Sequence, residues 1–195
     1  MRPFEGIKVI DVTHVLAGPF AAYQLAVLGA DVIKVEDPND CDQSRYSGSS
    51  DELNRTRMGT GYLAQGSNKR SITLNLKTEK GRDILRQLTK DADVFVENYR
   101  AGSFDALGIG YNDMKLLNPQ LVFCSMTAFG QDAPRGGQTA YDHAIQAISG
   151  IMASTGNRET APMKCGSPVV DYSTGLMAAF AISSALFQRA RTGCG

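Results

Sequence analysis

One carboxylate stands inside a long apolar stretch near the end of the chain. Asp171 occurs in SPVVDYSTGLMAAFAISSALFQ (residues 167–188), with Val169 and Val170 directly before it and a predicted apolar helix after it. An aspartate at a helix start can cap the helix by accepting a backbone N–H of the first turn. A carboxylate there also faces the positive end of the helix dipole, so it stays ionised and could attack an activated acyl group. The two roles are compatible, and the sequence predicts Asp171 at the helix N-terminus.

Predicted strands and helices alternate along the rest of the chain. Short runs rich in β-branched residues predict strands at residues 7–12, 31–36, 70–76, 93–98 and 121–130. Helices are predicted over 18–30, with Pro19 in the first turn and Gly29 as the stop, after Thr78, and over 112–119 and 141–155. This alternation predicts an α/β fold with a parallel sheet that helices cover on both faces.

In an open parallel sheet, ligands bind beyond the carboxyl ends of the strands, which directs attention to the loops there. The first such loop, THVLAGPF, contains only Gly18 and lacks the GxGxxG pattern of dinucleotide sites. Glu36 stands where a ribose-binding acid would be expected, although an acid at a strand end is often simply solvated. The polar stretch over 37–68 is too long for an idle connection, so we predict a functional or mobile loop there.

Basic side chains gather in one part of the sequence. They are either a phosphate-binding cluster or a solvated basic face, and they comprise Arg55, Arg57, Lys69, Arg70, Lys77, Lys80 and Arg82. Of the two histidines, His14 follows a strand and could line a site, whereas His143 lies in a predicted helix and fits a structural or exposed position. No HExxH, HxxxH or CxxC pattern occurs, so we predict no metal, and no GxSxG supports a serine hydrolase.

Composition excludes several classes of protein. The chain has 195 residues, enough for one domain, and its 20 Lys and Arg balance 20 Asp and Glu, which argues against a general nucleic-acid binder. We expect no membrane partner, since no uninterrupted apolar run reaches about 18 residues. Glu5 and Lys8 interrupt the N-terminal apolar stretch, which is untypical of a signal peptide. The four cysteines show no ligand spacing, and we read them as reduced thiols of a cytoplasmic protein.

Taken together, five segments resemble the class III coenzyme A transferases, the CaiB/BaiF-like family of formyl-CoA transferase and carnitine CoA-transferase. The segments are FEGIKVIDVTHVLAGPFAAYQLAVLGADVIKVEDP (4–38), NKRSITLNLKTEKGRDILRQLTKDADVFVENYRAG (68–102), LGIGYNDMKLLNPQLVFCSMTAFGQ (107–131), AYDHAIQAISGIMASTG (140–156) and VVDYSTGLMAAFAISSALFQRARTGCG (169–195). They cover nearly the whole chain in order. The resemblance is specific to the family and unspecific to any one substrate.

The resemblance implies a Rossmann-like fold and a mechanism. It places the catalytic aspartate at Asp171, which would attack an acyl-CoA donor, pass through an aspartyl anhydride and an aspartyl-CoA thioester, and transfer CoA to a carboxylic acid. Coenzyme A would be a substrate, with no prosthetic group. Backbone N–H groups at the helix N-terminus beside Asp171 would stabilise the oxyanions.

The family pattern also implies the residues that contact CoA. They are His14, Leu16, Ala17, Leu74, Asn75, Leu76, Lys77, Asn98, Tyr99, Arg100, Thr139, Ala140 and Tyr141. Some relatives carry nucleotide-binding arginines where this chain has Asp37 and Ala106, and Arg45 or Arg100 could substitute for them. Leu16 stands where oxalate-linked transferases carry a glutamine, which makes oxalate a doubtful acceptor.

Two other functions remain open. An α-methylacyl-CoA racemase would need a histidine at the position of Tyr141, and His143 lies two residues further, about 200° around a helix. A CoA- or nucleotide-binding module without catalysis is the second alternative. Family members are about twice as long, so residues 1–195 are expected to be a CoA-binding large domain without the second domain, and a homodimer or a complementary C-terminal half is the expected partner. Such a half should self-associate through exposed apolar surface.

Overall fold

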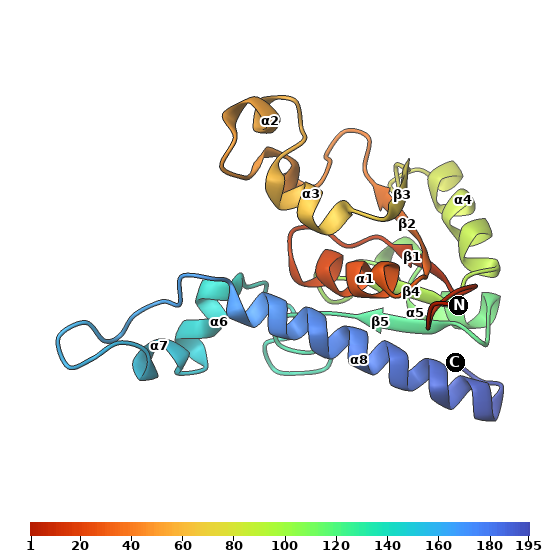
Figure 1. The fold of residues 1–195 in the computed structure, drawn as a ribbon. Coiled ribbons are helices and arrows are strands. Elements are labelled where there is room, and N and C mark those ends of the chain that lie inside the picture. Colours follow the sequence, from red (N-terminus) through yellow and green to blue (C-terminus); the bar gives the residue numbers. More distant parts are fainter.

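Five parallel strands form one sheet at the centre of the molecule (Figure 1). The computed structural model describes residues 1–195. The strands are β1 (Lys8–Asp11), β2 (Asp31–Glu36), β3 (Lys69–Thr73), β4 (Val94–Glu97) and β5 (Val122–Ser125). Their order is β3-β2-β1-β4-β5, and Val9 of β1 lies between Val32 of β2 and Val94 of β4. The predicted α/β fold is confirmed. The strand order is that of a Rossmann sheet: β2 and β3 are added on one side of β1, and β4 and β5 on its other side.

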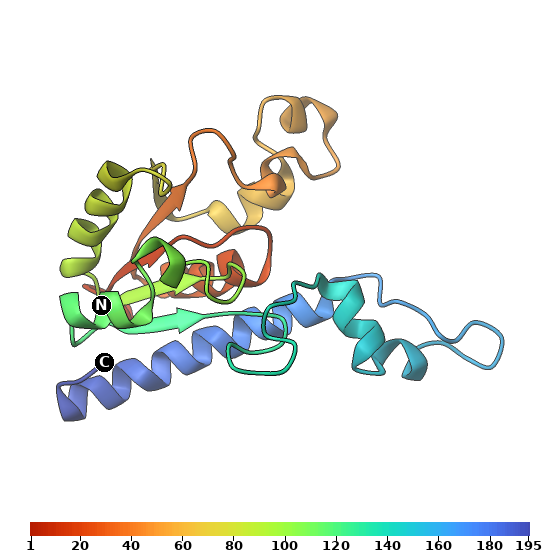
Figure 2. The ribbon, with the colours of Figure 1, turned by 180° about the vertical axis from the view of Figure 1, so that it is seen from behind.

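Helices cover both faces of the sheet, as predicted (Figures 1 and 2). On one face, α1 (Ala17–Val27) and α8 (Val169–Thr192) bury a cluster that includes Val9, Leu25 and Ile182. On the other, α4 (Glu79–Lys90) and α5 (Tyr111–Leu117) bury a second cluster that includes Leu85 and Phe95, beside the short turn η2 (Asp105–Leu107). Each fully buried side chain of this size contributes about 1.5–3 kcal/mol, so the two clusters fix the sheet between its helices.

The polar stretch after β2 is a structured excursion. It folds into η1 (Gln43–Tyr46), α2 (Asp51–Arg55) and α3 (Thr60–Gly66), which Figure 1 shows above the sheet. Ser50 caps α2 by accepting the N–H of Leu53, as its residue type favours. Periodicity missed these helices because they are short and have few apolar residues. The stretch is thus an ordered connection, and a functional role for it stays a prediction.

The single helix predicted over 141–155 is wrong. The segment forms α6 (Asp142–Ile148) and α7 (Ile151–Ser154), and Gly150 between them has a φ of +85°. A left-handed residue ends a helix, and glycine adopts this conformation without steric cost. The chain that follows α7 loops away from the body before it enters α8 (Figure 2). This route brings the start of α8 back beside α6.

Helix α8 is the longest element and packs along α1. Its 24 residues are long and apolar enough to cross a membrane by length and composition, with a mean hydropathy of 1.3 over an 18-residue window, although polar residues interrupt every apolar run before 18 residues. The face with Gly175, Ala178, Ile182 and Leu186 is buried, as in the core helix of a globular domain.

The opposite face of α8 carries large apolar side chains. Leu176, Met177, Phe180 and Phe187 are each more than half exposed. Their spacing places them along one side of the helix, away from the sheet. This apolar stripe is the exposed surface that the sequence led us to expect.

Candidate active site

A cleft opens at the carboxyl edge of the sheet, where β1 and β4 lie side by side. Its volume is about 580 Å³, enough for a substantial part of a nucleotide-sized ligand. Four loops and the start of α8 form its walls, with residues 13–17, 35–37, 40–43, 98–100 and 139–141 and Asp171. A smaller hollow of about 190 Å³ adjoins it and also includes Asp171. The position is the topological switch point, where open α/β sheets bind their ligands.

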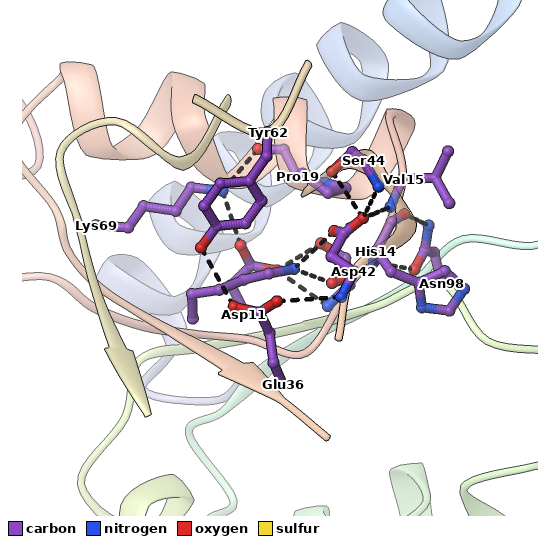
Figure 3. A network of polar contacts seen from close by, with 12 residues as sticks. Asp11, His14, Val15, Pro19, Glu36, Asp42, Ser44, Tyr62, Lys69 and Asn98 are labelled. Atoms are coloured by element: carbon purple, nitrogen blue, oxygen red, sulfur yellow. Dashed lines mark hydrogen bonds and ion pairs between the residues drawn. The ribbon is translucent and has the colours of Figure 1, made fainter. Parts of the chain in front are cut away.

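Buried charges, in place of glycines, shape the turn between β1 and α1 (Figure 3). Asp11 accepts hydrogen bonds from the N–H and hydroxyl of Thr13, and the ammonium group of Lys69 lies 2.8 Å from the same carboxylate. Lys69 also donates to the carbonyl of Pro19, and Lys34 donates to that of Thr13. Burial alone would raise the pKa of Asp11, yet the charges of Lys34 and Lys69 lower it. The network therefore stays ionised and holds both ends of the turn.

Gly18 is the one glycine that this turn requires. A Cβ atom at position 18 would overlap the side chain of Thr13. The close approach lets α1 begin directly beside the end of β1. Helix α1 starts at Ala17 in the cleft wall, and its N-cap residue Leu16 supplies no side-chain acceptor. The first-turn N–H groups of α1 consequently remain without a side-chain cap.

Asp171 lies in the cleft wall, but it does not cap α8. It is the third residue of the helix, and Pro168 is at the N-cap position without a side-chain hydrogen bond. The buried carboxylate of Asp142 takes the capping role, accepting the N–H of Val170 at 2.8 Å and that of Asp171 at 3.2 Å. The predicted oxyanion donors at the start of α8 are thus already engaged. The side chain of Asp171 is left free for chemistry.

The ionisation of Asp171 differs from the sequence-based expectation. Burial raises the pKa of its carboxyl above the ordinary value, and the nearby negative charge of Asp142 raises it further. A carboxylate that is partly desolvated and repelled by a neighbour is more basic and more nucleophilic than a solvated one. The arrangement suits a carboxylate that forms and releases acyl bonds.

A close helix crossing places Asp171 beside α1. Gly175 lies one turn after Asp171, and a Cβ atom there would come within 2.7 Å of the carbonyl oxygen of Ala17 and 2.9 Å of the Phe20 ring. The rings of Phe20 and Tyr172 meet edge to face at 4.8 Å beside this crossing. Only a residue without a side chain fits, so Gly175 sets the distance between Asp171 and the first turn of α1.

The structure brings most of the predicted CoA contacts together. His14, Leu16, Ala17, Asn98, Tyr99, Arg100, Thr139, Ala140 and Tyr141 line the cleft with Asp171. The rings of His14 and Tyr99 meet at 4.7 Å, and burial lowers the pKa of His14 and raises that of Tyr99 to about 12. Both rings are therefore uncharged at neutral pH.

Four predicted contacts lie outside the cleft lining. Leu74, Asn75, Leu76 and Lys77 follow β3 at the edge of the sheet, and Leu74 is buried in the core. The side chain of Asn75 accepts the N–H of Lys77, which shapes the turn into α4. The structure does not bring this group to Asp171.

The predicted phosphate cluster is not one surface. Lys69 is buried against Asp11, Arg70 pairs with Asp31 at 2.5 Å, and Arg82 pairs with Glu79. These side chains come from β3 and α4 and already have acidic partners. Sequence proximity overestimated the free positive charge, because the carboxylates that neutralise Lys69 and Arg70 come from β1 and β2.

Arg45 does not replace a nucleotide-binding arginine. Its guanidinium forms a two-pronged ion pair with Glu36, at 2.8 and 2.6 Å, and stacks on the ring of Tyr62 at 3.7 Å. This pair also accounts for Glu36, which is thus not available to a ribose. Arg100 is the basic side chain of the cleft lining, which also includes Asp37 and Asp40. Neither carboxylate has an ion-pair partner.

The histidine required by a racemase is not in the cleft. His143 is exposed on α6 and lines neither hollow, whereas Tyr141 lines both. Tyr141 precedes the helix as its N-cap, and its ring lies parallel to that of His143 at 6.2 Å. Because Tyr141 lies outside the helix, the angle of about 200° expected between two helical residues does not apply to this pair. Tyr141, and not His143, is the side chain that lines the cleft.

Sequence reasoning missed Asp142 and Gly175. Asp142 lies next to the predicted Tyr141, but its partners at the start of α8 are 28 and 29 residues away. Gly175 was visible as a glycine inside an apolar helix, which often marks a close backbone approach. That signal was present in the sequence and was not used.

The profile of CoA-transferase family III matches residues 4–195. The chain is 42% identical to human succinyl-CoA:glutarate CoA-transferase over 195 residues, all of this chain and 44% of the relative. It is 40% identical to formyl-CoA:oxalate CoA-transferase from Streptomyces avermitilis, again over the whole chain and 46% of the relative.

A solved structure agrees with these matches. A CaiB/BaiF family protein from Brucella suis superposes with a TM-score of 0.92 at 41% identity, over all of this chain and 51% of that one. The chain thus spans about half the length of the relatives it matches, as the resemblance led us to expect. The sequence, the Rossmann-type sheet and the matches to known proteins agree, and the chain belongs to CoA-transferase family III.

Proposed function

We propose that this chain carries the CoA site and the nucleophile of a transferase that moves CoA from an acyl-CoA to a carboxylic acid. The observation that carries the proposal is the cleft, in which residues from four loops far apart in the sequence surround the free carboxylate of Asp171. The relatives named above act on succinyl-CoA with glutarate and on formyl-CoA with oxalate. A short-chain acyl-CoA and a small carboxylic acid are therefore the proposed substrate classes.

In the proposed first half-reaction, a carboxylate oxygen of Asp171 attacks the thioester carbonyl carbon of the donor. The carbon–sulfur bond breaks, CoA leaves as a thiolate, and Asp171 is left in a mixed anhydride. The thiolate then attacks the aspartyl carbonyl carbon, which releases the donor acid and leaves CoA bound to Asp171 as a thioester. No external oxidant or reductant is needed.

The second half-reaction is the reverse with a new acid. The acceptor carboxylate attacks the aspartyl thioester and expels CoA thiolate, which then attacks the acceptor's carbonyl in the new anhydride. Acyl-CoA product forms and Asp171 returns as a carboxylate. The uncapped first turn of α1, beside Ala17 in the cleft wall, is the proposed donor to the oxyanions, since the amides of Val170 and Asp171 are bound to Asp142.

Calorimetric titration with CoA tests the binding part of this proposal. Dephospho-CoA, NAD and ATP serve as competitors of similar chemistry. Preference for CoA supports the proposal, and preference for NAD or ATP contradicts it. A matched variant, Asp171→Ala, is expected to bind CoA with little change, because the nucleotide contacts lie in the loops.

Mass spectrometry tests the chemical part. After incubation with succinyl-CoA, the intact chain is expected to carry CoA in a bond that hydroxylamine cleaves. Asp171→Ala should lose this adduct, and Asp132→Ala, at an exposed carboxylate outside the cleft, should keep it. CoA binding without any adduct would favour the non-catalytic binding module, or a site that a homodimer or a complementary C-terminal half must complete.

A further inference from the structure

Val15 has an unusual backbone conformation at the centre of the cleft wall. Its φ is +68°, in the left-handed region that β-branched residues avoid because of the clash with their own side chain. Turns of this shape normally use glycine or asparagine. His14, Val15 and Leu16 all line the cleft, so the unfavourable conformation occurs where the ligand would bind.

A buried carboxylate from another loop holds this conformation. Both oxygens of Asp42 lie 3.1 Å from the backbone nitrogen of Val15. Asp42 is only 5% exposed, and its Oδ1 also accepts the N–H and the hydroxyl of Ser44. The ammonium group of Lys34 lies 3.7 Å from its Oδ2. Ser44 and Lys34 thus hold the Asp42 carboxylate in addition to its contact with Val15.

The preceding residue is held by a second side chain. The amide group of Asn98, after β4, accepts the N–H of His14 at 2.9 Å and donates to its carbonyl at 2.8 Å (Figure 3). Two consecutive amides of the turn are therefore bound from the two sides of β1. A turn held in this way cannot relax without breaking hydrogen bonds to buried or partly buried groups.

The anchor of Asp42 connects the turn to the excursion after β2. The N–H of Asp42 donates to Glu36 at 3.1 Å, and Glu36 is bound by Arg45 and Tyr62. The contacts run from α3 through Glu36 and Asp42 to Val15. This explains why Glu36 and Arg45 are engaged with each other and not directed at a ligand.

We propose that Asp42 is a positioning residue, which holds Val15 in the left-handed conformation so that the His14–Leu16 turn is already shaped for its ligand. The inference rests on the proposed function for the identity of that ligand, coenzyme A, and on geometry alone for the hold on Val15. A pre-shaped turn spares the ordering cost that a glycine-rich loop would meet on binding.

Hydrogen exchange tests the hold on Val15 without any ligand. Asp42→Ala is expected to accelerate exchange of the Val15 amide at least about tenfold, since a hydrogen bond to a charged group is lost. Ser44→Ala is the matched control, because it removes another partner of Asp42 and leaves the Val15 contact in place. Unchanged exchange in a folded Asp42→Ala chain would overturn the inference. If that variant does not fold, Asp42→Asn, which keeps one oxygen, replaces it in the same comparison with a smaller expected change.

A rescue experiment tests the effect on binding. Asp42→Ala is expected to weaken CoA binding by about tenfold or more, and adding Val15→Gly should restore part of the loss, because glycine reaches the left-handed conformation without help. Loss of affinity without rescue would mean that Asp42 supports the fold in general, against the inference. If the unchanged chain prefers NAD or ATP to CoA, the proposed function fails, and the exchange comparison alone decides the role of Asp42.

Discussion

The carboxylate of Asp142 accepts the backbone N–H of Asp171 at 3.2 Å, and its charge also raises the pKa of the Asp171 side chain. One residue thus orders the start of α8 and adjusts the basicity of the proposed nucleophile. Gln146, one turn further along α6, donates to the other oxygen of Asp142 and accepts the N–H of Cys165 at 2.9 Å. The Asp142 carboxylate is thus held by groups from both α6 and α8.

Asp142→Asn is expected to lower the pKa of Asp171. The amide keeps an oxygen for the N–H groups of α8 but removes the like charge, while the larger effect of burial remains. Carbon-detected NMR titration of the Asp171 carboxyl should therefore show a smaller elevation than in the unchanged chain. If adduct formation from succinyl-CoA needs ionised Asp171, the pH at which the rate of adduct formation falls on the acidic side should be lower in Asp142→Asn. An unchanged titration would contradict the proposed coupling.

Stability against pH provides the control for this titration. The folded-state pKa of Asp171 lies above its unfolded value, so the folded state binds the proton more tightly and loses stability as pH rises through that range. Asp171→Asn removes the group. It should therefore be more stable than the unchanged chain above the raised pKa, and the difference should vanish below the unfolded value. Urea unfolding at several pH values measures the difference, and an opposite trend would mean that Asp171 is stabilised as the anion.

Gly175→Ala is expected to destabilise the fold. Alanine is favoured over glycine in a helix by about 1 kcal/mol, but the added methyl would press on Ala17 and Phe20, and overpacking costs about 1–3 kcal/mol. We expect a net loss of up to about 2 kcal/mol and a lower yield of the succinyl-CoA adduct, since α8 must move away from α1. Gly166→Ala adds the same methyl where nothing lies within 4 Å, and it should be close to neutral. A stabilised Gly175→Ala would show that the crossing tolerates a side chain.

Asp37→Arg is expected to strengthen CoA binding. The cleft wall holds the carboxylates of Asp37 and Asp40 without ion-pair partners, and both would repel the phosphates of CoA. Reversing one charge at a partly exposed position should raise the affinity by about tenfold at low salt, and less at high salt. Calorimetry at two salt concentrations measures the gain. Asp113→Arg, at a carboxylate outside the cleft lining, should change the affinity for CoA little. An equal gain in affinity from this variant would indicate a general charge effect.

Replacing Met177 and Phe180 by glutamate should reduce self-association of the chain. Both are more than half exposed on the stripe of α8, and apolar surface of this kind drives association in water. Sedimentation velocity at several concentrations should show oligomers for the unchanged chain and a smaller species for the double variant. Replacing exposed Leu116 of α5 by glutamate is the matched control. Equal sedimentation of all three would show that the stripe is not the contact surface.

The order of strands and helices was predictable from the sequence because it depends on local patterns. Buried β-branched runs identified all five strands to within a few residues, and Pro19 and Gly29 bracketed α1 as predicted. The two short helices after β2 were not predictable, since they depend on contacts such as the Arg45–Glu36 ion pair more than on their own periodicity. The break at Gly150 was a local signal that a continuous pattern concealed.

The sequence by itself determined that the fold is α/β, that the carboxyl edge of its sheet is the place to expect a ligand site, and that Asp171 is the carboxylate to examine. Only the tertiary structure decided which charges are free and which helix amides are occupied. Lys69, Arg70 and Arg45 looked available until Asp11, Asp31 and Glu36 were found beside them. Pairing of buried charges is set by three-dimensional proximity, because attraction and desolvation act over a few ångströms of space and not along the chain.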